Sequence, residues 1–307
     1  LDQSALPEAD VLVRIDYSTI NYKDALALTG AVPIARHYPM VPGIDFAGTV
    51  EHSEDPRWSV GTRVLLNGWG VDEGHWGGLS QYARVNGDWL LQVPPSLSTR
   101  QVMAIGTAGY TAALCVNALI DHGTAADDGP ILVTGATGGV GSISVALLAA
   151  AGYQVTAATG KLEAEDYLTN LGAHAVIDRS TLTESGKPLQ KELWNGVIDA
   201  VGGNTLANAC AQTRYGGAVA ACGLAESPKL PTTVMPFILR GVTLYGIDSV
   251  MAPVARRERA WQRIAEHLNS DLLDGVVQEI ALAQALTEAS SVIAGKVTGR
   301  LLVDVNR

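Results

Sequence analysis

The sequence predicts an α/β protein of two domains, one rich in β-strands and one built on a doubly wound parallel sheet. Between residues 11 and 95, short strand-like segments are separated by Gly or Pro about every ten residues, which is typical of an all-β barrel. After residue 130, strand-like and helix-like segments alternate, which favours parallel strands with helices on both faces. The length of 307 residues is enough for two such domains, each with its own core.

In the first region, alternating apolar and polar residues predict strands that are buried on one face. The pattern is clearest in VLVRIDY at residues 11–17. The four strands expected here lie at residues 11–17, 44–52, 61–69 and 79–85. The region ends at the Pro94-Pro95 pair, and a last strand is expected much later, at residues 299–305.

The second region begins with a long, Ala-rich helix predicted over Thr99–His122, with two glycines in its middle. Parallel strands are expected at residues 130–135, 153–160, 175–180, 196–202, 216–223 and 242–250. Helices are expected at residues 142–152, 164–173 and 255–268, the last of them amphipathic. We therefore assign residues 1–105 and 270–307 to the β-rich domain and residues 106–269 to the parallel-sheet domain.

Composition excludes several classes of protein. The chain has 21 Lys and Arg against 31 Asp and Glu, a net charge of −10, which argues against a nucleic-acid partner because phosphates need a basic face. The three cysteines, Cys115, Cys210 and Cys222, have no CxxC spacing, so a disulfide framework and a four-cysteine zinc lobe are both excluded. This cysteine usage predicts a reducing, cytoplasmic setting.

Membrane and export signals are not visible in the sequence. Apolar runs such as Ile143–Ala151 are shorter than the roughly 20 residues that cross a bilayer, so we expect no membrane partner. The first residues lack a basic segment followed by an apolar one, which argues against a signal peptide. The sequence starts at Leu1 rather than Met and soon enters a strand, so we expect the natural chain to begin earlier.

A glycine-rich turn is the strongest single motif. VTGATGGVG at residues 133–141 follows a predicted strand and opens a helix, which is the context of a dinucleotide-binding turn in a Rossmann domain. Small residues let backbone N–H groups and the helix N-terminus approach a pyrophosphate. Against the G-x-G-x-x-G pattern, Ala136 takes the first position, while Gly138 and Gly141 fit. The alternative is a tight strand-to-helix turn that binds no ligand.

The end of the second parallel strand indicates which dinucleotide is bound. An NAD site usually places an acid there, but this sequence has Ala158-Thr159-Gly160-Lys161. Thr159 and Lys161 offer a hydroxyl and a cation for a 2′-phosphate, and Arg179 after the third strand could add a second cation. The sequence thus favours NADPH over NADH, the alternative being that Lys161 is an ordinary solvated lysine.

Several long motifs carry a family resemblance. The chain resembles the medium-chain dehydrogenase/reductase superfamily in INYKDAL (20–26), VPGIDFAGTV (41–50), GTAGYTAAL (106–114) and VTGATGGVG (133–141). Residues 68–85, 215–225 and 230–251 resemble its quinone-oxidoreductase-like branch, which includes NADPH-dependent acrylyl-CoA reductases. The match runs in order over essentially the whole chain. It implies a GroES-like catalytic domain joined to a Rossmann domain.

The positions of the zinc ligands in zinc-dependent members of this superfamily are altered. Asn21 and Ile44 stand at the positions of the first Cys and the His, and Thr107 stands near the third ligand. None of these side chains replaces a zinc ligand, so we expect no catalytic zinc and no metal site. The scattered histidines His37, His52, His75 and His174 are interpreted as surface or packing residues.

The resemblance implies a reductase that transfers hydride from NADPH to an activated C=C bond, converting acrylyl-CoA to propionyl-CoA. Without a Lewis acid for alcohol oxidation, reduction of a conjugated alkene is the easier chemistry. Two alternatives stay open at this point. One is an NADPH:quinone oxidoreductase or other enone reductase, and the other is a non-catalytic NADPH-binding protein.

The resemblance also implies a set of site residues. Tyr22 corresponds to a cofactor contact, and Asn21 and Asp45 line the cleft, so the catalytic candidates are Asn21, Tyr22 and Asp45. A tyrosine at this place could also simply be packed. The residues expected to border the pyrophosphate, the nicotinamide half and the cofactor edge are Thr137, Gly138, Gly139, Val140, Leu224, Ile247 and Arg300.

Two partners follow from the same resemblance. The phosphates of a CoA substrate need local cations, for which the candidates are Arg36, Arg256, Arg257 and Arg259, although the last three could equally form the solvated face of a helix. VTLYGIDSV at residues 242–250 is expected to pair with its own copy in a second subunit, because an open apolar edge strand is a liability. We therefore expect a homodimer.

Overall fold

Contacts within the chain divide it into two units, and the computed structural model describes residues 3–269, 275 and 277–307. Unit 1 comprises Leu1–Ala108, Ser249–Glu258 and Asn269–Arg307, and unit 2 comprises Gly109–Asp248 and Arg259–Leu268. Residues 106–108, 249–258 and 269, assigned from the sequence to the parallel-sheet domain, therefore group with the β-rich unit. The expected return to that domain at residue 270 lies outside the described residues.

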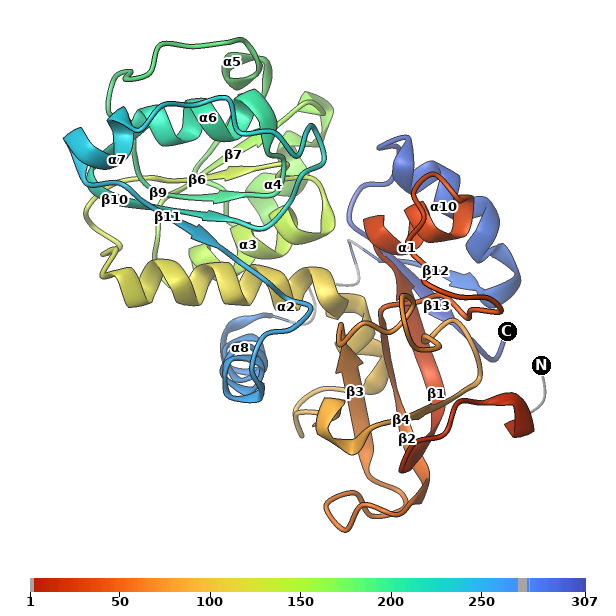
Figure 1. The fold of residues 1–307 in the computed structure, drawn as a ribbon. Helices are drawn as coiled ribbons and strands as arrows, with labels where there is room; N and C mark the ends of the chain where they lie inside the picture. The colour runs from red at the N-terminus through yellow and green to blue at the C-terminus, as the bar shows by residue number, and fades with distance from the viewer. Residues whose placement is uncertain (1–2, 270–274, 276) are drawn as a thin grey trace. The chain divides into compact units, whose positions relative to one another are not determined.

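Unit 1 contains one seven-stranded, largely antiparallel sheet (Figure 1). Its strands are β1 (Val11–Ile20), β2 (Asp45–Ser53), β3 (Arg63–Asn67), β4 (Tyr82–Val85), β5 (Leu91–Gln92), β12 (Val277–Ala281) and β13 (Arg300–Asp304). The order is β12-β13-β1-β2-β3-β5, and β4 also pairs with β1. Side chains on both faces of β1 are buried, rather than only one face as the alternating pattern predicts.

Two helices that the sequence did not predict complete unit 1. They are α1 (Tyr22–Thr29) and α10 (Ala285–Ile293), which contact each other, and short 3₁₀ turns lie at Gln3–Ala5, Gly87–Trp89 and Leu282–Gln284. The core beneath them is formed by buried side chains of the sheet, such as Ile15, Phe46 and Leu66. This core fixes the ends of β1 and β2, from which the polar residues described below project.

Unit 2 is built on a six-stranded sheet in which every neighbouring pair of strands is parallel. The strands are β6 (Ile131–Thr134), β7 (Val155–Thr159), β8 (Ala175–Asp178), β9 (Trp194–Asp199), β10 (Thr213–Ala221) and β11 (Thr243–Gly246), in the order β11-β10-β9-β6-β7-β8. The strand order reverses direction between β6 and β9. In such sheets, ligands bind beside the carboxyl ends of the strands at this reversal.

Helices cover both faces of this sheet, with α3 on one side and α6 on the other (Figure 1). The helical elements of unit 2 are α3 (Gly139–Ala150), the 3₁₀ turn Leu162–Ala164, α4 (Glu165–Asn170), α5 (Ser180–Thr183), α6 (Gly203–Gln212) and α7 (Met235–Arg240). Helices α2 (Thr99–His122) and α8 (Val254–His267) each contribute residues to both units. The sequence did not predict α5, α6 and α7. The predicted α/β class with a doubly wound parallel sheet is confirmed.

Helix α2 is interrupted where the sequence predicted continuous helix. Gly106 has φ 55° and ψ −162°, a left-handed φ that favours glycine, and it breaks the helical hydrogen-bond pattern. By length and composition α2 could cross a membrane, but 89% of its most apolar window is buried inside the protein. It is therefore interpreted as a core helix. The break at Gly106 becomes important in the site.

Candidate active site

The carboxyl edge of the unit 2 sheet brings together the cofactor residues predicted for that unit. They lie at or after the carboxyl ends of β6, β7, β8, β10 and β11, in the last residue of β7, in the following loops or in the first turn of α3. Because all the strands are parallel, these loops open at one edge. The residues gathered there are Thr137, Gly138, Gly139, Val140, Thr159, Gly160, Lys161, Arg179, Leu224 and Ile247.

The glycine-rich turn after β6 forms a tight loop. Gly135 has φ 60°, and its carbonyl accepts a hydrogen bond of 2.9 Å from the Gly138 N–H. Gly138 is exposed and caps the N-terminus of α3, so the free N–H groups of the first helical turn face the sheet edge. A backbone shaped this way can accept an anionic ligand.

Close packing explains why Gly141 must be glycine. A Cβ atom at Gly141 would lie 2.3 Å from the Gly135 carbonyl oxygen and 2.6 Å from the Ala136 Cα. At Gly138 the nearest atom to a Cβ is that same oxygen, at 3.3 Å. Gly141 thus lets α3 pack against the turn, while Gly138 keeps the ligand side open. This cradle fits the pyrophosphate of a dinucleotide.

Predicted contacts to the adenosine end lie side by side. The Thr159 hydroxyl is 3.1 Å from the Thr137 hydroxyl and accepts a 3.0 Å hydrogen bond from the Lys161 N–H. The Arg179 N–H donates to the Thr159 carbonyl at 2.9 Å. A Cβ at Gly160 would lie 2.7 Å from the Arg179 Nε, so the guanidinium crosses directly over this glycine. Two basic residues therefore flank a small, exposed residue at the tip of β7.

Asp199, at the end of β9, is a residue of this edge that sequence reasoning missed. It is fully buried, accepts a 2.6 Å hydrogen bond from the Thr134 hydroxyl, and accepts from the Gly202 N–H at 2.8 Å. Burial raises its pKa, although these hydrogen bonds oppose the effect. Asp199 ties the ends of β6 and β9 together at the strand-order reversal. The acid directly after the apolar run of β9 was the available signal.

On the far side of this edge, the loops after β10 and β11 approach each other. The Ile247 N–H donates to the Ala221 carbonyl at 2.9 Å, and Leu224 is 56% exposed. A Cβ at Gly223 would lie 2.2 Å from the Ala200 carbonyl oxygen. Glycine is thus required for the chain to pass close to the end of β9, leaving the Leu224 side chain facing outward.

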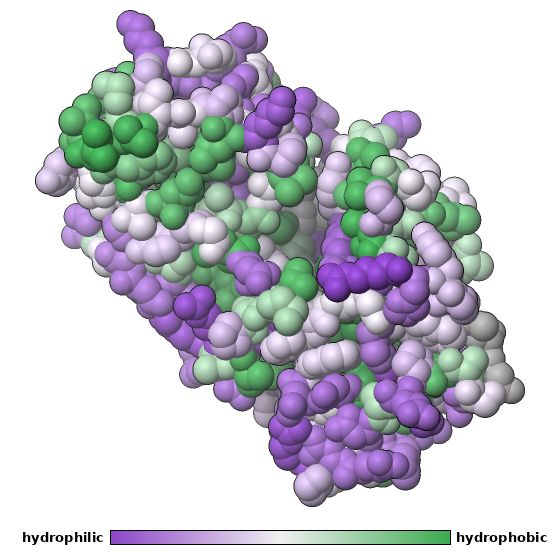
Figure 2. All heavy atoms as spheres, in the orientation of Figure 1, coloured by the Kyte–Doolittle hydropathy of each residue, from purple (hydrophilic) through white to green (hydrophobic). Residues whose placement is uncertain are grey.

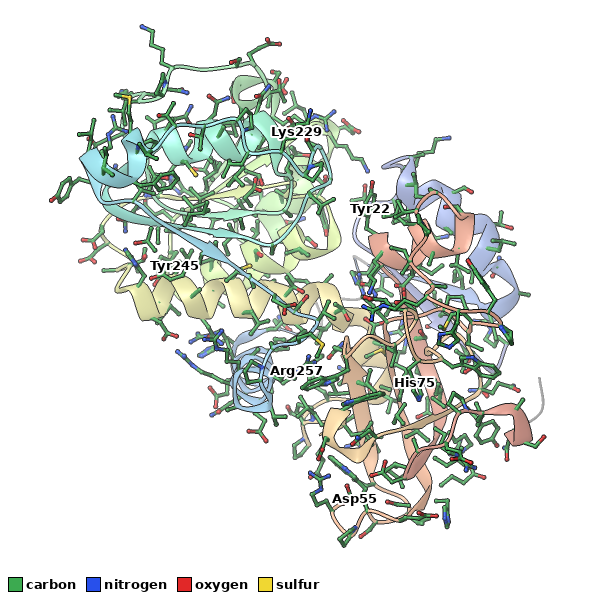
Figure 3. The ribbon with its side chains drawn as sticks, in the orientation of Figure 1. Tyr22, Asp55, His75, Lys229, Tyr245 and Arg257 are labelled. Carbon is green, nitrogen blue, oxygen red and sulfur yellow. The ribbon has the colours of Figure 1, made fainter. Side chains whose placement is uncertain are left out.

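In unit 1, the site is organised around the first turn of α1. Asn21 is the N-cap residue of this helix, and its N–H donates to the Asp24 carboxylate at 2.7 Å. The other Asp24 oxygen accepts from the Ile44 N–H at 2.8 Å. Tyr22, the first helical residue, is 42% exposed, whereas Asn21 is 8% exposed (Figure 3). Tyr22 is therefore the member of this group that can reach a ligand.

Asp45, predicted to line the cleft, lies in a buried hydrogen-bond network. One carboxylate oxygen accepts from the Thr19 hydroxyl at 2.6 Å. The other accepts from the Asn21 amide at 3.1 Å and from the Thr107 N–H at 2.7 Å. Asp45 has no exposed surface. Its position favours an indirect role over the direct one predicted from the sequence.

Arg300 is 4% exposed, so it is not the exposed arginine that was the alternative to a cofactor contact. Its Nη1 donates to the Asn21 amide oxygen at 3.0 Å, and its Nε donates to the Ala104 carbonyl at 3.3 Å. Burial lowers its pKa, and the nearby Asp45 and Asp24 carboxylates oppose this effect. Sequence reasoning placed Arg300 at a cofactor edge but not in contact with Asn21.

A second cluster of charges lies under α1. The Lys23 ammonium is 3.2 Å from the Asp72 carboxylate and also pairs with Glu73, which Arg36 contacts at 3.1 Å. Burial raises the pKa of Asp72 to about 6, with Lys23 opposing the shift. Burial and the neighbouring Asp72 and Asp45 carboxylates raise the pKa of Asp24 well above its usual value. No local sequence pattern predicts this cluster.

The residues at the zinc-ligand positions do not fit zinc. The Asn21 amide and the Thr107 N–H both donate to the same Asp45 oxygen, and Ile44 has no ligand atom in its side chain. Zinc prefers thiolate, imidazole or carboxylate ligands with free lone pairs. Within residues 3–269, 275 and 277–307, no group of three His, Cys, Asp or Glu side chains is placed to hold a metal.

The structure contradicts the prediction for one of the candidate CoA-binding arginines, Arg257. Arg257 is 2% exposed and donates to the backbone carbonyls of Ala252, Asn67 and Val250, with its guanidinium 4.1 Å from the centre of the Trp69 ring (Figure 3). It holds the 249–258 segment of unit 1 and cannot face a substrate, so that prediction is wrong.

The other candidate arginines remain accessible. Arg256 is exposed, Arg259 pairs with Asp121 at 2.6 Å, and Arg36 pairs with Glu73.

One chain thus combines a doubly wound parallel sheet, with a glycine cradle at its ligand edge, and a β-rich unit with a helix-capping polar network. This combination defines the fold class of the two-domain dehydrogenases and reductases. The alcohol dehydrogenase GroES-like domain family matches residues 7–95, and the zinc-binding dehydrogenase family matches residues 139–294. The chain belongs to the medium-chain dehydrogenase/reductase superfamily, with a GroES-like domain and a Rossmann domain, as the sequence predicted.

Two curated relatives are similar to this chain over nearly their whole length. The chain is 55% identical over 306 residues to "Probable acrylyl-CoA reductase AcuI" of Escherichia coli (strain K12), a match that covers 100% of this chain and 94% of that protein. It is 52% identical over 307 residues to "Acrylyl-CoA reductase AcuI" of Ruegeria pomeroyi (strain ATCC 700808 / DSM 15171 / DSS-3), covering 100% and 93% of the two chains.

Two solved structures are also close. The yhdH oxidoreductase from Salmonella enterica in complex with NADP has a TM-score of 0.98 and 54% identity, covering 99% of this chain and 94% of that one. The Bacillus subtilis protein yhfP with NAD bound has a TM-score of 0.95 and 44% identity, covering 99% and 93%. One of these two structures contains NADP and the other NAD. The residues at the tip of β7 therefore bear on the choice between the two dinucleotides in this chain.

Proposed function

We propose that this protein is an NADPH-dependent reductase of activated C=C bonds, and that its substrate is acrylyl-CoA, which it converts to propionyl-CoA. The observation that carries the proposal is the full-length identity of 55% and 52% to two proteins named as acrylyl-CoA reductases. Two features of the structure support the proposal. The glycine cradle after β6 fits a dinucleotide, and the exposed Tyr22 at the start of α1 can contact a bound ligand.

The cofactor we propose is NADPH rather than NADH. Support comes from Arg179 lying over Gly160, from Lys161 beside it, and from the lack of an acid at the tip of β7. A 2′-phosphate placed over Gly160 would meet both cations, and such charge-assisted contacts discriminate strongly against a bare hydroxyl. The N–H groups of Thr137, Gly139 and Val140 would hold the pyrophosphate, the Gly138 N–H being bonded to the Gly135 carbonyl.

When bound, NADPH supplies the hydride, and the conjugated carbonyl of the substrate accepts the negative charge as an enolate. The residues of this chain orient the alkene, exclude water and stabilise that charge. We propose that Tyr22 contacts the cofactor and substrate directly, with its hydroxyl able to donate a hydrogen bond, and that the site operates without zinc. Leu224 and Ile247 are proposed to border the nicotinamide half.

Two other functions are weaker candidates. The fold also carries quinone reductases, so a quinone or a small enone is the nearest alternative acceptor. A protein that binds NADPH without turnover is the alternative from another class.

A substrate panel separates all three. NADPH oxidation would be followed with acrylyl-CoA, crotonyl-CoA, a benzoquinone and no acceptor. We expect the highest kcat/KM with acrylyl-CoA. Turnover of quinones alone would overturn the proposal, and tight NADPH binding without turnover of any acceptor would favour the binding protein.

We further propose a cytoplasmic homodimer. β11 is an edge strand of the unit 2 sheet and pairs only with β10 among the described strands. Beside it, the apolar patch formed by Leu230, Val234, Met235, Ile238 and Leu239 is exposed (Figure 2). An exposed apolar patch next to an open strand edge supports association of two copies through this surface. Three free cysteines support a reducing compartment.

A further inference from the structure

Two opposite charges are buried in unit 1 without touching each other. Asp45 is fully buried and Arg300 is 4% exposed, yet no ion pair within 4 Å joins them among the described residues. The Asn21 side chain lies between them. Its amide oxygen accepts from Arg300 Nη1 at 3.0 Å, and its amide nitrogen donates to Asp45 at 3.1 Å. A neutral amide thus bridges a buried cation and a buried anion.

This arrangement fixes the Asn21 side chain in one orientation. The amide oxygen faces the cation and the NH₂ group faces the anion, so the amide dipole is aligned with the field between them. A flipped amide would turn its NH₂ group toward the guanidinium and its oxygen toward the carboxylate, and both buried charges would lose a hydrogen bond. The second N–H of the amide donates to the Thr19 hydroxyl at 2.9 Å, so both amide hydrogens are used.

The break in α2 supplies one further partner to each charge, while Arg300 Nη2 has no hydrogen-bond partner among the described residues. In a continuous helix, the Thr107 N–H and the Ala104 carbonyl would bond to other backbone groups of α2. At the break, the Thr107 N–H instead donates to Asp45 at 2.7 Å, and the Ala104 carbonyl accepts from Arg300 Nε at 3.3 Å. A Cβ at Gly106 would lie 2.3 Å from Arg300 Nη2, so glycine is needed here for space as well as for its φ of 55°.

The bridge is connected directly to the start of α1. Asn21 is the N-cap of that helix, and its own N–H donates to Asp24, which also accepts from the Ile44 N–H. Ile44 and Asp45 are adjacent in sequence, so the chain at the start of β2 holds the first turn of α1 at two points. Tyr22 is the next residue after Asn21 and projects from this turn.

We propose that Asp45 and Arg300 are positioning residues that act through the Asn21 amide to hold Tyr22 in the orientation needed for reduction. This inference deepens the proposed function, because it rests on Tyr22 facing the ligand. It replaces the direct catalytic role predicted for Asp45 and Asn21, and the cofactor contact predicted for Arg300, with an indirect one. Of the three residues at or near the zinc-ligand positions, Asn21 and Thr107 both donate to Asp45, through the side-chain amide and the backbone N–H, and Ile44 donates its N–H to Asp24.

The first test is Asp45→Asn, which keeps the shape and removes the anion. Its amide NH₂ would face the Asn21 and Thr107 donors or the Thr19 hydroxyl, and Arg300 would keep only Asp24 as a nearby carboxylate among the described residues. We expect kcat with the best acceptor to fall at least tenfold while the Kd for NADPH stays within about twofold, because the phosphate cradle is in unit 2. The matched control is Asp16→Asn, an acid on β1 that pairs only with Arg14 at 3.5 Å among the described residues.

The double variant Asp45→Asn/Arg300→Met separates positioning from stability. Removing both charges relieves the cost of an unpaired buried charge, so the melting temperature should recover relative to Asp45→Asn alone. Turnover should not recover, because the amide is no longer oriented. If turnover returned together with the melting temperature, or if Asp45→Asn kept the wild-type kcat, the bridge would be merely structural and the proposal would be overturned.

A spectroscopic measurement makes the test independent of turnover. In protein labelled with 3-fluorotyrosine, the ¹⁹F signal of Tyr22 is identified by its loss in Tyr22→Phe. We expect this signal to shift or broaden in Asp45→Asn and in Asn21→Ala but not in Asp16→Asn. An unchanged Tyr22 signal in the first two variants contradicts the positioning role. If the wild type reduces no acceptor, the proposed function fails. The ¹⁹F signal of Tyr22 still tests the positioning role of Asp45 and Arg300 in that case.

Discussion

The candidate site residues of the two units differ in kind, being backbone groups in unit 2 and side chains in unit 1. At the edge of the unit 2 sheet, backbone groups form the predicted binding surface, and glycines at Gly138, Gly141 and Gly160 keep side chains out of the way. In unit 1, side chains carry the arrangement, and Thr19, Asn21, Asp45, Thr107 and Arg300 hold one another in a buried network. The backbone site depends on local sequence, whereas the side-chain network depends on residues far apart in the chain.

This difference sets how each unit should respond to mutation. A backbone site fails when an added atom closes the approach of the ligand, so small substitutions have large effects on binding. A side-chain network fails when one partner is removed and another is left buried without its hydrogen bond. Changes in unit 2 should therefore act mainly on cofactor affinity. Changes in unit 1 should act mainly on turnover and on the dependence of stability on pH.

The largest expected effect is that of Gly141→Ala. The added Cβ would lie 2.3 Å from the Gly135 carbonyl oxygen, so the glycine turn and α3 must move apart. We expect the affinity for NADPH to fall by at least about 100-fold, equivalent to about 2.7 kcal/mol. Fluorescence titration of NADPH measures this. Gly246→Ala is the control, since no atom lies within 4 Å of its Cβ position, and it should bind NADPH normally.

The next effect concerns the choice of dinucleotide. Lys161→Ala and Arg179→Ala should each weaken NADPH binding by roughly tenfold or more while leaving NADH binding within about twofold, because only NADPH carries the 2′-phosphate. The ratio of the two dissociation constants measures the effect. Lys191→Ala is a matched control, because Lys191 is exposed and precedes β9 at the opposite edge of the sheet. Equal losses for both dinucleotides would contradict the assignment.

The difference between a local backbone motif in unit 2 and long-range side-chain contacts in unit 1 explains what the sequence could predict. The strand-turn-helix around residues 133–141 is a continuous motif, and its place in a parallel sheet was predicted correctly. The lack of an acid after β7 and the basic Arg179 could also be read from the sequence, because each lies directly after a strand. Their juxtaposition at Gly160 followed from the parallel arrangement of the strands.

The network of unit 1 was only partly predictable. Asn21, Asp45 and Arg300 were selected by resemblance, but their mutual contacts join three distant segments and leave no local pattern. The break in α2 was missed because a left-handed φ at a single glycine does not change the hydrophobic period of a helix. Helix α1 was missed because its eight residues are too few for a clear period. Arg257 was misassigned because its acceptors are backbone carbonyls, which sequence patterns do not reveal.

A smaller effect is expected at the proposed dimer surface. Ile238→Asp places a charge on a side chain that is 71% exposed in the apolar patch beside β11. We expect the apparent molecular mass at micromolar concentration to shift from dimer to monomer in sedimentation equilibrium, because burying an unpaired carboxylate opposes association. Val60→Asp, at an equally exposed valine of unit 1 (70%), should leave the dimer intact. A monomeric wild type, or a dimeric Ile238→Asp, would contradict this surface.

The smallest effect concerns pH and the acid cluster under α1. The pKa of Asp72 is raised from 3.8 to about 6, so the folded state binds its proton more tightly than the unfolded state does. This contribution to the free energy of unfolding is present at low pH and is lost as the pH rises through about 4 to 6. Asp72→Asn does not titrate. Its stability relative to wild type should therefore rise over this range.

Urea unfolding of both proteins at several pH values between 4 and 7 measures this difference. A constant difference across that range would show that Asp72 has the same proton affinity in the folded and unfolded states, and would contradict the raised pKa.

The central claim is that the chain transfers hydride from NADPH to the alkene of an acyl-CoA without a metal. The most direct measurement is mass spectrometry of the product formed from acrylyl-CoA and NADPH deuterated at the transferred position of C4, after dialysis of the protein against EDTA. We predict propionyl-CoA with one deuterium on the carbon β to the thioester. Absence of propionyl-CoA, or product without deuterium, would contradict the account, as would activity that returns only when zinc is added.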